Sequence, residues 1–229
     1  MASIYKHNLY QIISPKKLKH LKLHKVIKRD GKHYLHTYFE GENVYKIPFN
    51  PTGTCKPGGM YFTDYLNIPL YADTYGTLIA DVTFPEDAKI YVETNKFKAD
   101  KIIISNIRPL EKFFSDFNYP KLHAVKLNGK ILKYFKEQTE KICLEAVKQA
   151  QDILKYIEKQ NKEICLEAVR EDGYNLRHVE NQTEEICIEA VKQNGYVLKF
   201  VKNQTPKIYL EAVKQNPLAE RHIRIVIDF

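Results

Sequence analysis

Apolar and polar positions repeat with a fixed period in the C-terminal half of the chain. The hexapeptide Ile-Cys-Leu-Glu-Ala-Val begins at Ile142 and returns, exactly or in a closely related form, at Ile164, Ile186 and Ile208, each time 22 residues on. A degenerate fifth copy occupies residues 121–125 in the same register. A unit that cannot bury its apolar face alone must stack on neighbours of the same kind. The pattern therefore predicts an array of five units.

Each unit is predicted to be a helical hairpin. At 100° per residue, the apolar residues of 142–150 cover a broad face, and Glu145 and Lys148 fall on the opposite side. A second apolar pair, such as Leu176 and Val179, then follows at the spacing of another short helix. Such a broad apolar face suits a helix that is covered on both flanks.

Candidate helix caps fall where this arrangement needs them. Side chains able to accept a hydrogen bond from the first helical turn precede the motif by three residues: Thr139, Asn161, Thr183 and Thr205. Gly173 and Gly195 lie near the ends of the preceding helices, where glycine can adopt the left-handed C-cap conformation. Pro217 replaces this glycine in the last copy, so we expect the turn of that unit to differ.

Residues 1–116 lack the 22-residue period. Short β-branched and aromatic runs broken by Gly and Pro predict strands at 44–49, 60–63, 77–84, 89–93 and 101–107. Asp30-Gly31, between Val26-Ile27 and Tyr34-Leu35, predicts a two-residue hairpin, and Ser14-Pro15 predicts a helix over 16–21. The expected fold class is α+β: a mixed, mainly β module at 1–116, then an all-α solenoid of five helical hairpins with a C-terminal cap at 117–229.

Composition and charge narrow the class of protein. Of the 229 residues 44% are hydrophobic, and the formal net charge is +8. No run approaches the roughly 18 apolar residues of a membrane span, and the N-terminus lacks the pattern of a signal peptide. We expect an intracellular, soluble protein with no membrane partner and no cofactor.

Three of the four cysteines, Cys143, Cys165 and Cys187, occupy one position of the repeat. Stacked helices would hold them about 10 Å apart, whereas the Cα atoms of a disulfide lie within about 7 Å. We expect reduced core residues, and no zinc site because no C-x-x-C pair or nearby His accompanies them. Cys55 stands alone and is expected to be a buried structural thiol rather than a nucleophile.

Charged side chains recur on the exposed side of the predicted array. An acidic row and a basic row three residues later form the candidate binding face: Glu145, Lys148, Glu167, Arg170, Glu189, Lys192, Glu211 and Lys214. This spacing allows i,i+3 ion pairs, which favours a salt-bridged surface. Single-stranded nucleic acid is the alternative ligand, because a second basic row is followed by rings. That row and its rings are Lys133-Tyr134, Lys155-Tyr156, Arg177-His178, Lys199-Phe200 and Arg221-His222. We expect the rings to pack between units.

A candidate basic patch lies in the N-terminal module. Its members are Lys16, Lys17, Lys19, Lys22, Lys25, Lys28, Arg29 and Lys32. Such a cluster could bind nucleic acid or another anionic surface. Apolar residues interrupt it throughout, which favours the solvated side of a helix and hairpin.

Several segments carry a family resemblance. The runs Tyr38-Phe39-Glu40-Gly41-Glu42-Asn43, Cys55-Lys56-Pro57-Gly58-Gly59-Met60-Tyr61-Phe62-Thr63 and Pro85-Glu86-Asp87-Ala88-Lys89 resemble the N-terminal domain of mimivirus-type giant-virus proteins. In that family the domain commonly precedes ankyrin or other helical repeats. The repeat Glu-Ala-Val-Lys-Gln-Asn, at 189–194 and 211–216, is similar to short helical repeats of such viruses. The resemblance implies a protein of the infected host cytoplasm or virus factory, or one packaged in the virion.

Residues 58–64, Gly-Gly-Met-Tyr-Phe-Thr-Asp, also resemble a strand of ADP-ribosyltransferases. In that family the Tyr of this strand stacks on nicotinamide, an upstream His holds the nicotinamide ribose, and a later Glu often completes the site. Tyr61 matches, but Gln11 stands where the His is expected and no Glu can be assigned. The resemblance implies a degenerate transferase-like module as the remotest alternative.

Strict repetition without a convergent polar cluster predicts a non-enzymatic binding or adaptor protein. Its helical repeats would present a surface to a host or viral protein partner. Single-stranded RNA binding through the basic rows is the alternative function.

Overall fold

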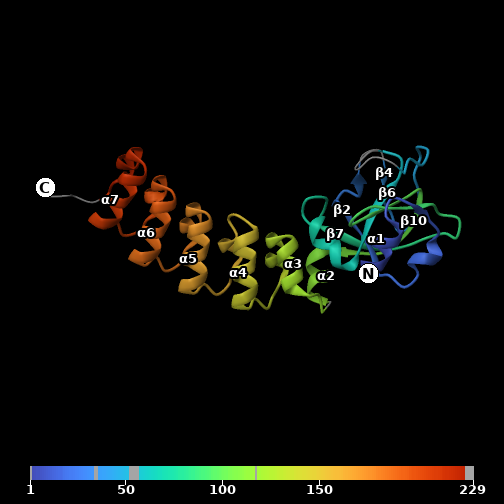
Figure 1. Ribbon diagram of the computed structural model, residues 1–229, viewed down its shortest axis with the longest axis horizontal. Helices are drawn as coiled ribbons and strands as arrows, with labels where there is room; N and C mark the ends of the chain where they lie inside the picture. The colour runs from blue at the N-terminus through green and yellow to red at the C-terminus, as the bar shows by residue number, and fades with distance from the viewer. Residues whose placement is uncertain (1, 34–35, 52–56, 117, 225–229) are drawn as a thin grey trace. The chain divides into compact units, whose positions relative to one another are not determined.

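The structure is a computed structural model of the chain that describes residues 2–33, 36–51, 57–116 and 118–224. The chain divides into two compact units, Met1–Tyr119 and Pro120–Phe229, here called the N-terminal unit and the helical unit. The first contains a β-sheet and the second is helical (Figure 1), which agrees with the expected α+β class. Tyr119 belongs to the N-terminal unit because its hydroxyl lies 2.8 Å from the carbonyl oxygens of both Tyr65 and Leu66.

An eight-stranded antiparallel sheet forms the centre of the N-terminal unit. The strands lie in the order β1-β8-β9-β6-β2-β7-β10-β5, and β3 and β4 form a separate two-stranded ribbon. Their bounds are β1 Ile12–Ile13, β2 Leu23–Ile27, β3 Lys32–His33, β4 His36–Thr37, β5 Gly41–Val44, β6 Met60–Asp64, β7 Leu78–Thr83, β8 Ile90–Val92, β9 Phe97–Ala99 and β10 Lys101–Pro109.

Short helices lie between these strands. The α-helices are α1 Ala2–Asn8 and α2 Leu110–Asp116, and the 3₁₀ helices, labelled η, are η1 Pro15–Leu18 and η2 Tyr65–Leu70. Helix η2 begins where the Asp64 carboxylate accepts hydrogen bonds from the N–H groups of Leu66 and Asn67, at 2.9 and 3.2 Å.

Alternate residues of the strands form one hydrophobic core cluster of the N-terminal unit. The alternation of a strand directs Met60 and Phe62 of β6 into it, and Ile102 and Ile104 of β10 likewise. The Phe62 ring stacks on Phe97 of β9, with ring centroids 5.3 Å apart. Aromatic burial of this kind is a large contribution to a small core.

The strands at 60–63, 77–84, 89–93 and 101–107 are confirmed to within a few residues, whereas the one predicted at 44–49 lies earlier, as β5. The hairpin predicted at Asp30-Gly31 stays a prediction, because its second arm, Tyr34-Leu35, lies outside the described residues, as does Cys55. Its first arm, Val26-Ile27, pairs with β7, and Gly31, with φ of 70°, lies just before β3.

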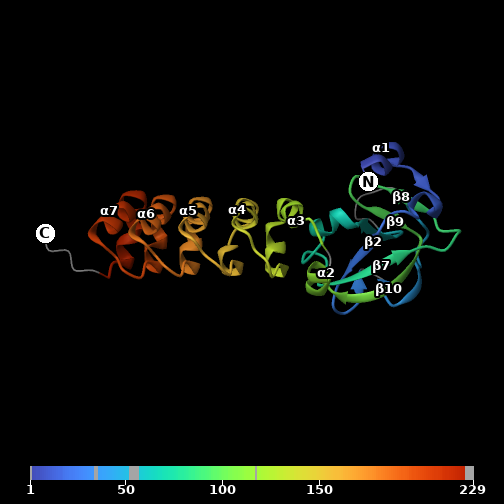
Figure 2. The ribbon, with the colours of Figure 1, turned by 90° about the horizontal axis from the view of Figure 1, so that it is seen from below.

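Along the helical unit, α-helices and 3₁₀ helices alternate (Figures 1 and 2). The α-helices are α3 Lys121–Leu127, α4 Glu140–Gln149, α5 Lys162–Glu171, α6 Glu184–Gln193 and α7 Pro206–Gln215. The 3₁₀ helices are η3 Gly129–Tyr134, η4 Leu154–Tyr156, η5 Gly173–His178, η6 Gly195–Phe200 and η7 Pro217–His222. Each α-helix packs against the next along the chain. Among the described residues, no helix has the length and apolarity needed to cross a bilayer.

The caps and cysteines of the repeat mostly behave as the sequence predicts. Asn161 accepts a hydrogen bond from the N–H of Ile164 at 2.8 Å, and Thr183 and Thr205 accept equivalent bonds. Thr139 occupies the same position without a side-chain bond. The three repeat cysteines are free and buried, which confirms their role in packing: Cys143, Cys165 and Cys187. Burial raises the pKa of the Cys187 thiol to about 11, so it stays protonated near neutral pH.

The glycines of the repeat are not left-handed C-caps, contrary to the prediction. Gly173 and Gly195 are the first residues of η5 and η6, and neither has a positive φ. They are needed because the next helix approaches closely: a methyl group on Gly173 would come within 2.8 Å of the Ala190 carbonyl oxygen of α6. The Gly173 N–H also donates to Gln193 Oε1 at 2.9 Å. Contact with the following repeat therefore selects glycine.

In the last repeat, Pro217 occupies the position that Gly173 and Gly195 occupy in earlier repeats. The turn of the last repeat was expected to differ, but η7 has six residues and its N-cap, Asn216, has φ −147° and ψ 108°. The equivalent Asn194 before η6 has φ −153° and ψ 104°. The prediction was wrong because this position has a negative φ, which suits proline at the start of a helix.

The second repeat shows what happens without the glycine. Ala150-Gln151 replaces the Asn-Gly or Asp-Gly of other repeats, so the capping side chain and the glycine are both lost. Here Asp152 adopts a φ of 57°, and η4 shortens to three residues. A side chain at position 151 thus changes the turn.

A row of glutamines joins consecutive repeats, and the pattern of apolar and charged positions does not predict this role. Its members are Gln138, Gln160, Gln182 and Gln204, spaced by one period. The Gln182 Nε2 donates to the Leu176 carbonyl of its own repeat at 3.0 Å and to Phe200 of the next at 3.1 Å. Its Oε1 accepts from the Lys202 N–H at 2.8 Å. One amide thus satisfies backbone groups of two neighbouring repeats.

We predict that Gly173→Ala lowers the free energy of unfolding by about 1–3 kcal/mol, because its methyl group would overlap the α6 carbonyl. The matched change Pro217→Ala should alter stability by less than about 0.5 kcal/mol. Urea unfolding of the two variants measures both values. Equal effects would show that contact with the next helix does not select the glycine.

We also predict that Gln182→Ala destabilises the helical unit by about 1–3 kcal/mol, since it leaves backbone groups of two repeats without their partner. The exposed Gln151 supplies the control, Gln151→Ala, which should have little effect. Amide hydrogen exchange should show faster opening on both sides of residue 182. Unchanged exchange there would contradict a joining role.

Candidate functional site

The candidate binding face lies on the α-helices of the helical unit. Its four glutamates are half-buried and its four cationic residues are exposed, at matching positions of α4, α5, α6 and α7. They are Glu145, Lys148, Glu167, Arg170, Glu189, Lys192, Glu211 and Lys214. Because adjacent helices pack together, equivalent positions of neighbouring helices follow one another along the stack.

Ion pairs within this face form both inside and between repeats. Glu189 pairs with Lys192 at 3.5 Å, the i,i+3 contact that the spacing predicts. It also accepts a hydrogen bond from Arg170 Nε of the preceding repeat at 3.0 Å, which lowers the pKa of the Glu189 carboxyl. The contact between repeats was not predicted, because a sequence offset does not reveal which side chains meet across two helices.

A groove of about 290 Å³ interrupts the face at α6 and α7. It is lined by Glu184, Glu185, Ile188, Glu189, Lys192, Lys207 and Glu211. Four carboxylates against two amines make the groove lining acidic, although Glu189 and Glu185 also pair with Arg170 and Lys162 outside the lining. Three of the candidate face residues, Glu189, Lys192 and Glu211, therefore come together here.

Two of the five rings that follow the second basic row, Phe200 and His222, contact a ring of the preceding repeat, as predicted. The Tyr174 ring meets Phe200 with centroids 5.9 Å apart, and Tyr196 meets His222 at 4.7 Å. Lys199 Nζ lies 4.0 Å from the centroid of the Tyr196 ring. The rings of Phe200 and His222, both half-buried, therefore contribute to the contact between repeats.

The candidate basic patch of the N-terminal unit is not uniform. Seven of its members, Lys16, Lys17, Lys19, Lys22, Lys28, Arg29 and Lys32, are exposed. Lys25 is the exception, with 4% of its surface exposed, so it cannot belong to a surface patch. Its position on β2 between Leu23 and Ile27, both core residues, turns it to the inner side of the strand.

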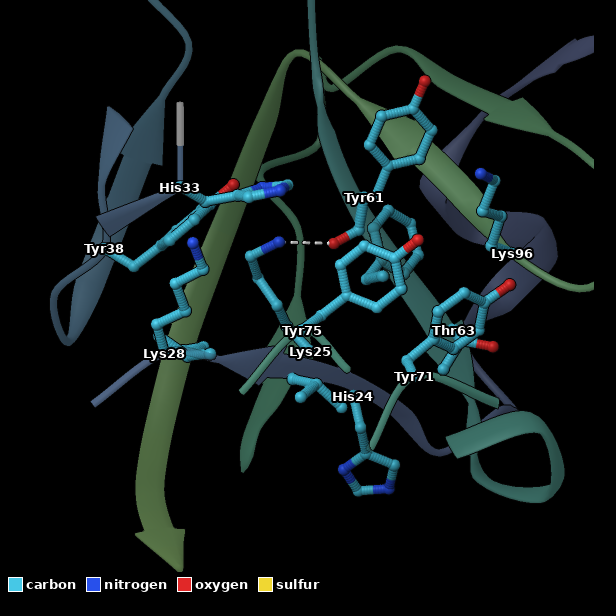
Figure 3. A pocket seen from close by; sticks show the side chains of 13 residues that line it. His24, Lys25, Lys28, His33, Tyr38, Tyr61, Thr63, Tyr71, Tyr75 and Lys96 are labelled. Carbon is cyan, nitrogen blue, oxygen red and sulfur yellow. Dashed lines mark hydrogen bonds between the residues drawn. The ribbon is translucent and has the colours of Figure 1, made fainter. Parts of the chain in front are cut away.

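Lys25 projects instead into a cavity of about 60 Å³ in the N-terminal unit (Figure 3). The cavity is lined by His24, Lys25, Val26, Ile27, Lys28, His33, Tyr38, Tyr61, Phe62, Thr63, Tyr71, Tyr75 and Lys96. Lys25 Nζ donates to the Tyr61 carbonyl oxygen at 2.6 Å and lies 4.1 Å from the centroid of the Tyr38 ring. Burial lowers the pKa of its amine to about 7.

His24 points away from the other labelled side chains of the cavity (Figure 3). Its ring packs edge-on against Phe113 of α2, with centroids 5.1 Å apart, and its Nδ1 lies 3.0 Å from Asp81 Oδ1. Burial lowers the pKa of His24 to about 4, although the nearby Asp81 carboxylate acts in the opposite direction. His24 and Lys25, successive residues of β2, thus point to opposite faces of the strand.

The cavity does not reproduce a transferase site. Tyr61 is among its lining residues, but Gln11 is exposed and is not. The described lining includes no Asp or Glu that could take the role of the later glutamate. Glu93 is not among the lining residues; its carboxylate pairs with the lining residue Lys96 at 3.5 Å.

A single signal could have located this cavity from the sequence. In Leu23-His24-Lys25-Val26-Ile27, strand alternation puts Lys25 on the same side as two large apolar residues. Charged side chains are rarely buried, so a lysine at an inward position of a strand is the signal that points to this cavity. The aromatic rings of the cavity come from three separate segments, which local patterns do not bring together.

Comparison with known proteins finds a family pattern that matches the repeats, and three mimivirus proteins that are similar to part of the chain. The pattern of a domain of unknown function (DUF4116) matches residues 139–183 and, one repeat later, 161–205. Three proteins of Acanthamoeba polyphaga mimivirus, named as ankyrin repeat proteins, are 32%, 34% and 31% identical to the chain over 107, 113 and 96 residues. The alignments cover 43%, 45% and 39% of this chain and 34%, 18% and 29% of those proteins.

The chain thus spans about a third or less of the length of these relatives. No solved structure matches it. The mimivirus similarities support a relationship to a giant-virus family, as the sequence resemblance implied.

The buried His24 predicts a pH dependence of stability. Unfolding restores its pKa to about 6.5, whereas the folded value is about 4, so the unfolded chain binds more protons between these values. The free energy of unfolding should therefore fall as the pH is lowered from about 6.5 to about 4. His33, with a pKa also lowered to about 4, acts in the same direction.

Urea unfolding at a series of pH values measures this slope. His24→Phe keeps a ring against Phe113 and should flatten the slope, leaving the parts due to His33 and to His36, whose pKa is also lowered by burial. A slope as steep in the variant as in the original chain would exclude His24 as its source.

Proposed function

We propose that this chain is a non-enzymatic adaptor of a giant virus and that its helical unit presents a protein-interaction surface. The observation that carries the proposal is the charged row on α4 to α7, which ends in the acidic groove at α6 and α7. The mimivirus relatives named for ankyrin repeats support a repeat-based interaction role. The proposal includes five stacked hairpins and no catalytic step.

The groove favours a particular kind of protein partner. Glu184, Glu185 and Glu211 line it together with the side chain of Ile188. A partner segment with Lys or Arg beside a small apolar residue would match both features, and charge would accelerate the encounter. We place this interaction in the host cytoplasm or virus factory, or in the virion.

Charge reversal in the groove tests the proposal. We predict that Glu184→Lys/Glu211→Lys lowers recovery of a partner protein about tenfold or more in affinity purification from infected cells, because it places positive charge where the partner is positive. Glu158→Lys/Glu180→Lys makes the same charge change at exposed positions outside the groove and should preserve recovery. Quantitative mass spectrometry compares the two. Equal recovery by both variants, or no specific protein with the original chain, would exclude the groove as an interaction site.

Single-stranded RNA binding is the competing function, because the chain carries a net charge of +8. Phosphate-driven binding is strongest at low salt and weakens steeply as salt rises. Fluorescence anisotropy with labelled single-stranded RNA at low salt should show no complex if the adaptor proposal is right. A salt-sensitive complex that depends on Lys148 and Lys214 would favour the nucleic-acid function instead.

A further inference from the structure

The cavity of the N-terminal unit is walled mainly by aromatic rings. Tyr38 is buried, whereas Tyr75 is 39% exposed and marks the side that is open to solvent. The rings of the lining are Tyr38, Tyr61, Phe62, Tyr71 and Tyr75. Flat apolar walls with few polar groups are typical of small-molecule sites, and ring faces stack on flat ligands.

The charged side chains of the same cavity are all basic. Lys25, Lys28 and Lys96 line it together with His33, and the described lining contains no carboxylate. Glu93 offsets the charge of Lys96. Lys25 and Lys28 both oppose protonation of His33, which shows that these basic groups act on one another. The buried Lys25 has no carboxylate among the described lining residues, so an anion bound in the cavity would favour the charged form of its amine.

Lys25 occupies the inner end of this arrangement. An ammonium group has three donors. The Tyr61 carbonyl accepts one of them, and the Tyr38 ring lies beside the group. Lys28 also lines the cavity (Figure 3). The lining therefore holds two amines that could each donate to an oxygen of a bound ligand.

We propose that this cavity binds a small oxyanion carried on a flat ring, such as an aromatic carboxylate or an aromatic phosphate monoester. The oxyanion would accept hydrogen bonds from Lys25 and Lys28, and the ring would lie against Tyr75 at the solvent side. The volume of about 60 Å³ sets the size limit. A cavity of about 150 Å³ accommodates benzene, so this one holds the charged head while the ring extends towards the mouth.

Proton uptake is a consequence of this binding mode. The Lys25 amine has a pKa lowered to about 7 by burial, so it is mostly neutral at pH 8. An oxyanion beside it favours the charged form and raises this pKa. Binding at pH 8 should therefore take up protons from the buffer, which a purely structural lysine would not do.

Isothermal titration calorimetry of the full chain at pH 8 tests the site with benzoate and phenyl phosphate. Benzamide is the uncharged control of the same shape. We expect benzoate or phenyl phosphate to bind and benzamide not to bind. Titration in two buffers of different ionisation enthalpy should show proton uptake.

Variants assign the binding to the cavity. Lys25→Met keeps an apolar chain of similar length in the buried position, and Lys28→Met alters an exposed residue whose loss leaves folding intact. Each should weaken binding about tenfold, the usual effect of removing a charge-assisted hydrogen bond, and Lys25→Met should also abolish the proton uptake. Lys19→Met makes the same charge change outside the cavity and should bind as before.

Three results would overturn the proposal: no binding of either anion, equal binding of benzamide, or unchanged affinity in both Lys25→Met and Lys28→Met. None of these results bears on the helical unit, so the adaptor function is tested separately.

Discussion

The helical unit depends on the contact that each repeat makes with the next. A 22-residue unit of one α-helix and one 3₁₀ helix leaves backbone groups at its turns that must be satisfied elsewhere. The glutamines Gln138, Gln160, Gln182 and Gln204 each donate to a carbonyl group of the following repeat, and Gln138, Gln182 and Gln204 also donate to their own repeat. Since each amide has a fixed shape, it also limits how far two repeats can shift. Stacking of the apolar helices supplies the cohesion, and these amides set the register.

The same close contact explains which residues can vary. Gly129 and Gly173 lie against carbonyl groups of the next α-helix, where no larger residue fits. The second repeat, with Gln151 at this position, has a shorter 3₁₀ helix and a positive φ at Asp152. That carboxylate then pairs with Arg177 and His178 of the following repeat, at 2.7 Å each. A changed turn thus creates a different contact between repeats.

The two units offer different kinds of candidate site. On the helical unit, charged positions repeat at the surface and include the acidic groove lining at α6 and α7. In the N-terminal unit, a lysine lies within a ring-lined cavity, where low polarity strengthens each electrostatic interaction. The first arrangement suits a protein segment, the second a small ion.

The repeat, its caps at Asn161, Thr183 and Thr205, its buried cysteines and most strands of the sheet could be predicted from the amino-acid sequence, because these follow from local periodicity and hydrogen bonding. The reason why Gly173 is glycine, the partners of the glutamines and the direction of the Lys25 side chain emerged only from the folded structure. Each of these depends on atoms far apart in the chain. Local sequence patterns limit the secondary structure that a segment can form, whereas tertiary packing decides which residues that segment contacts.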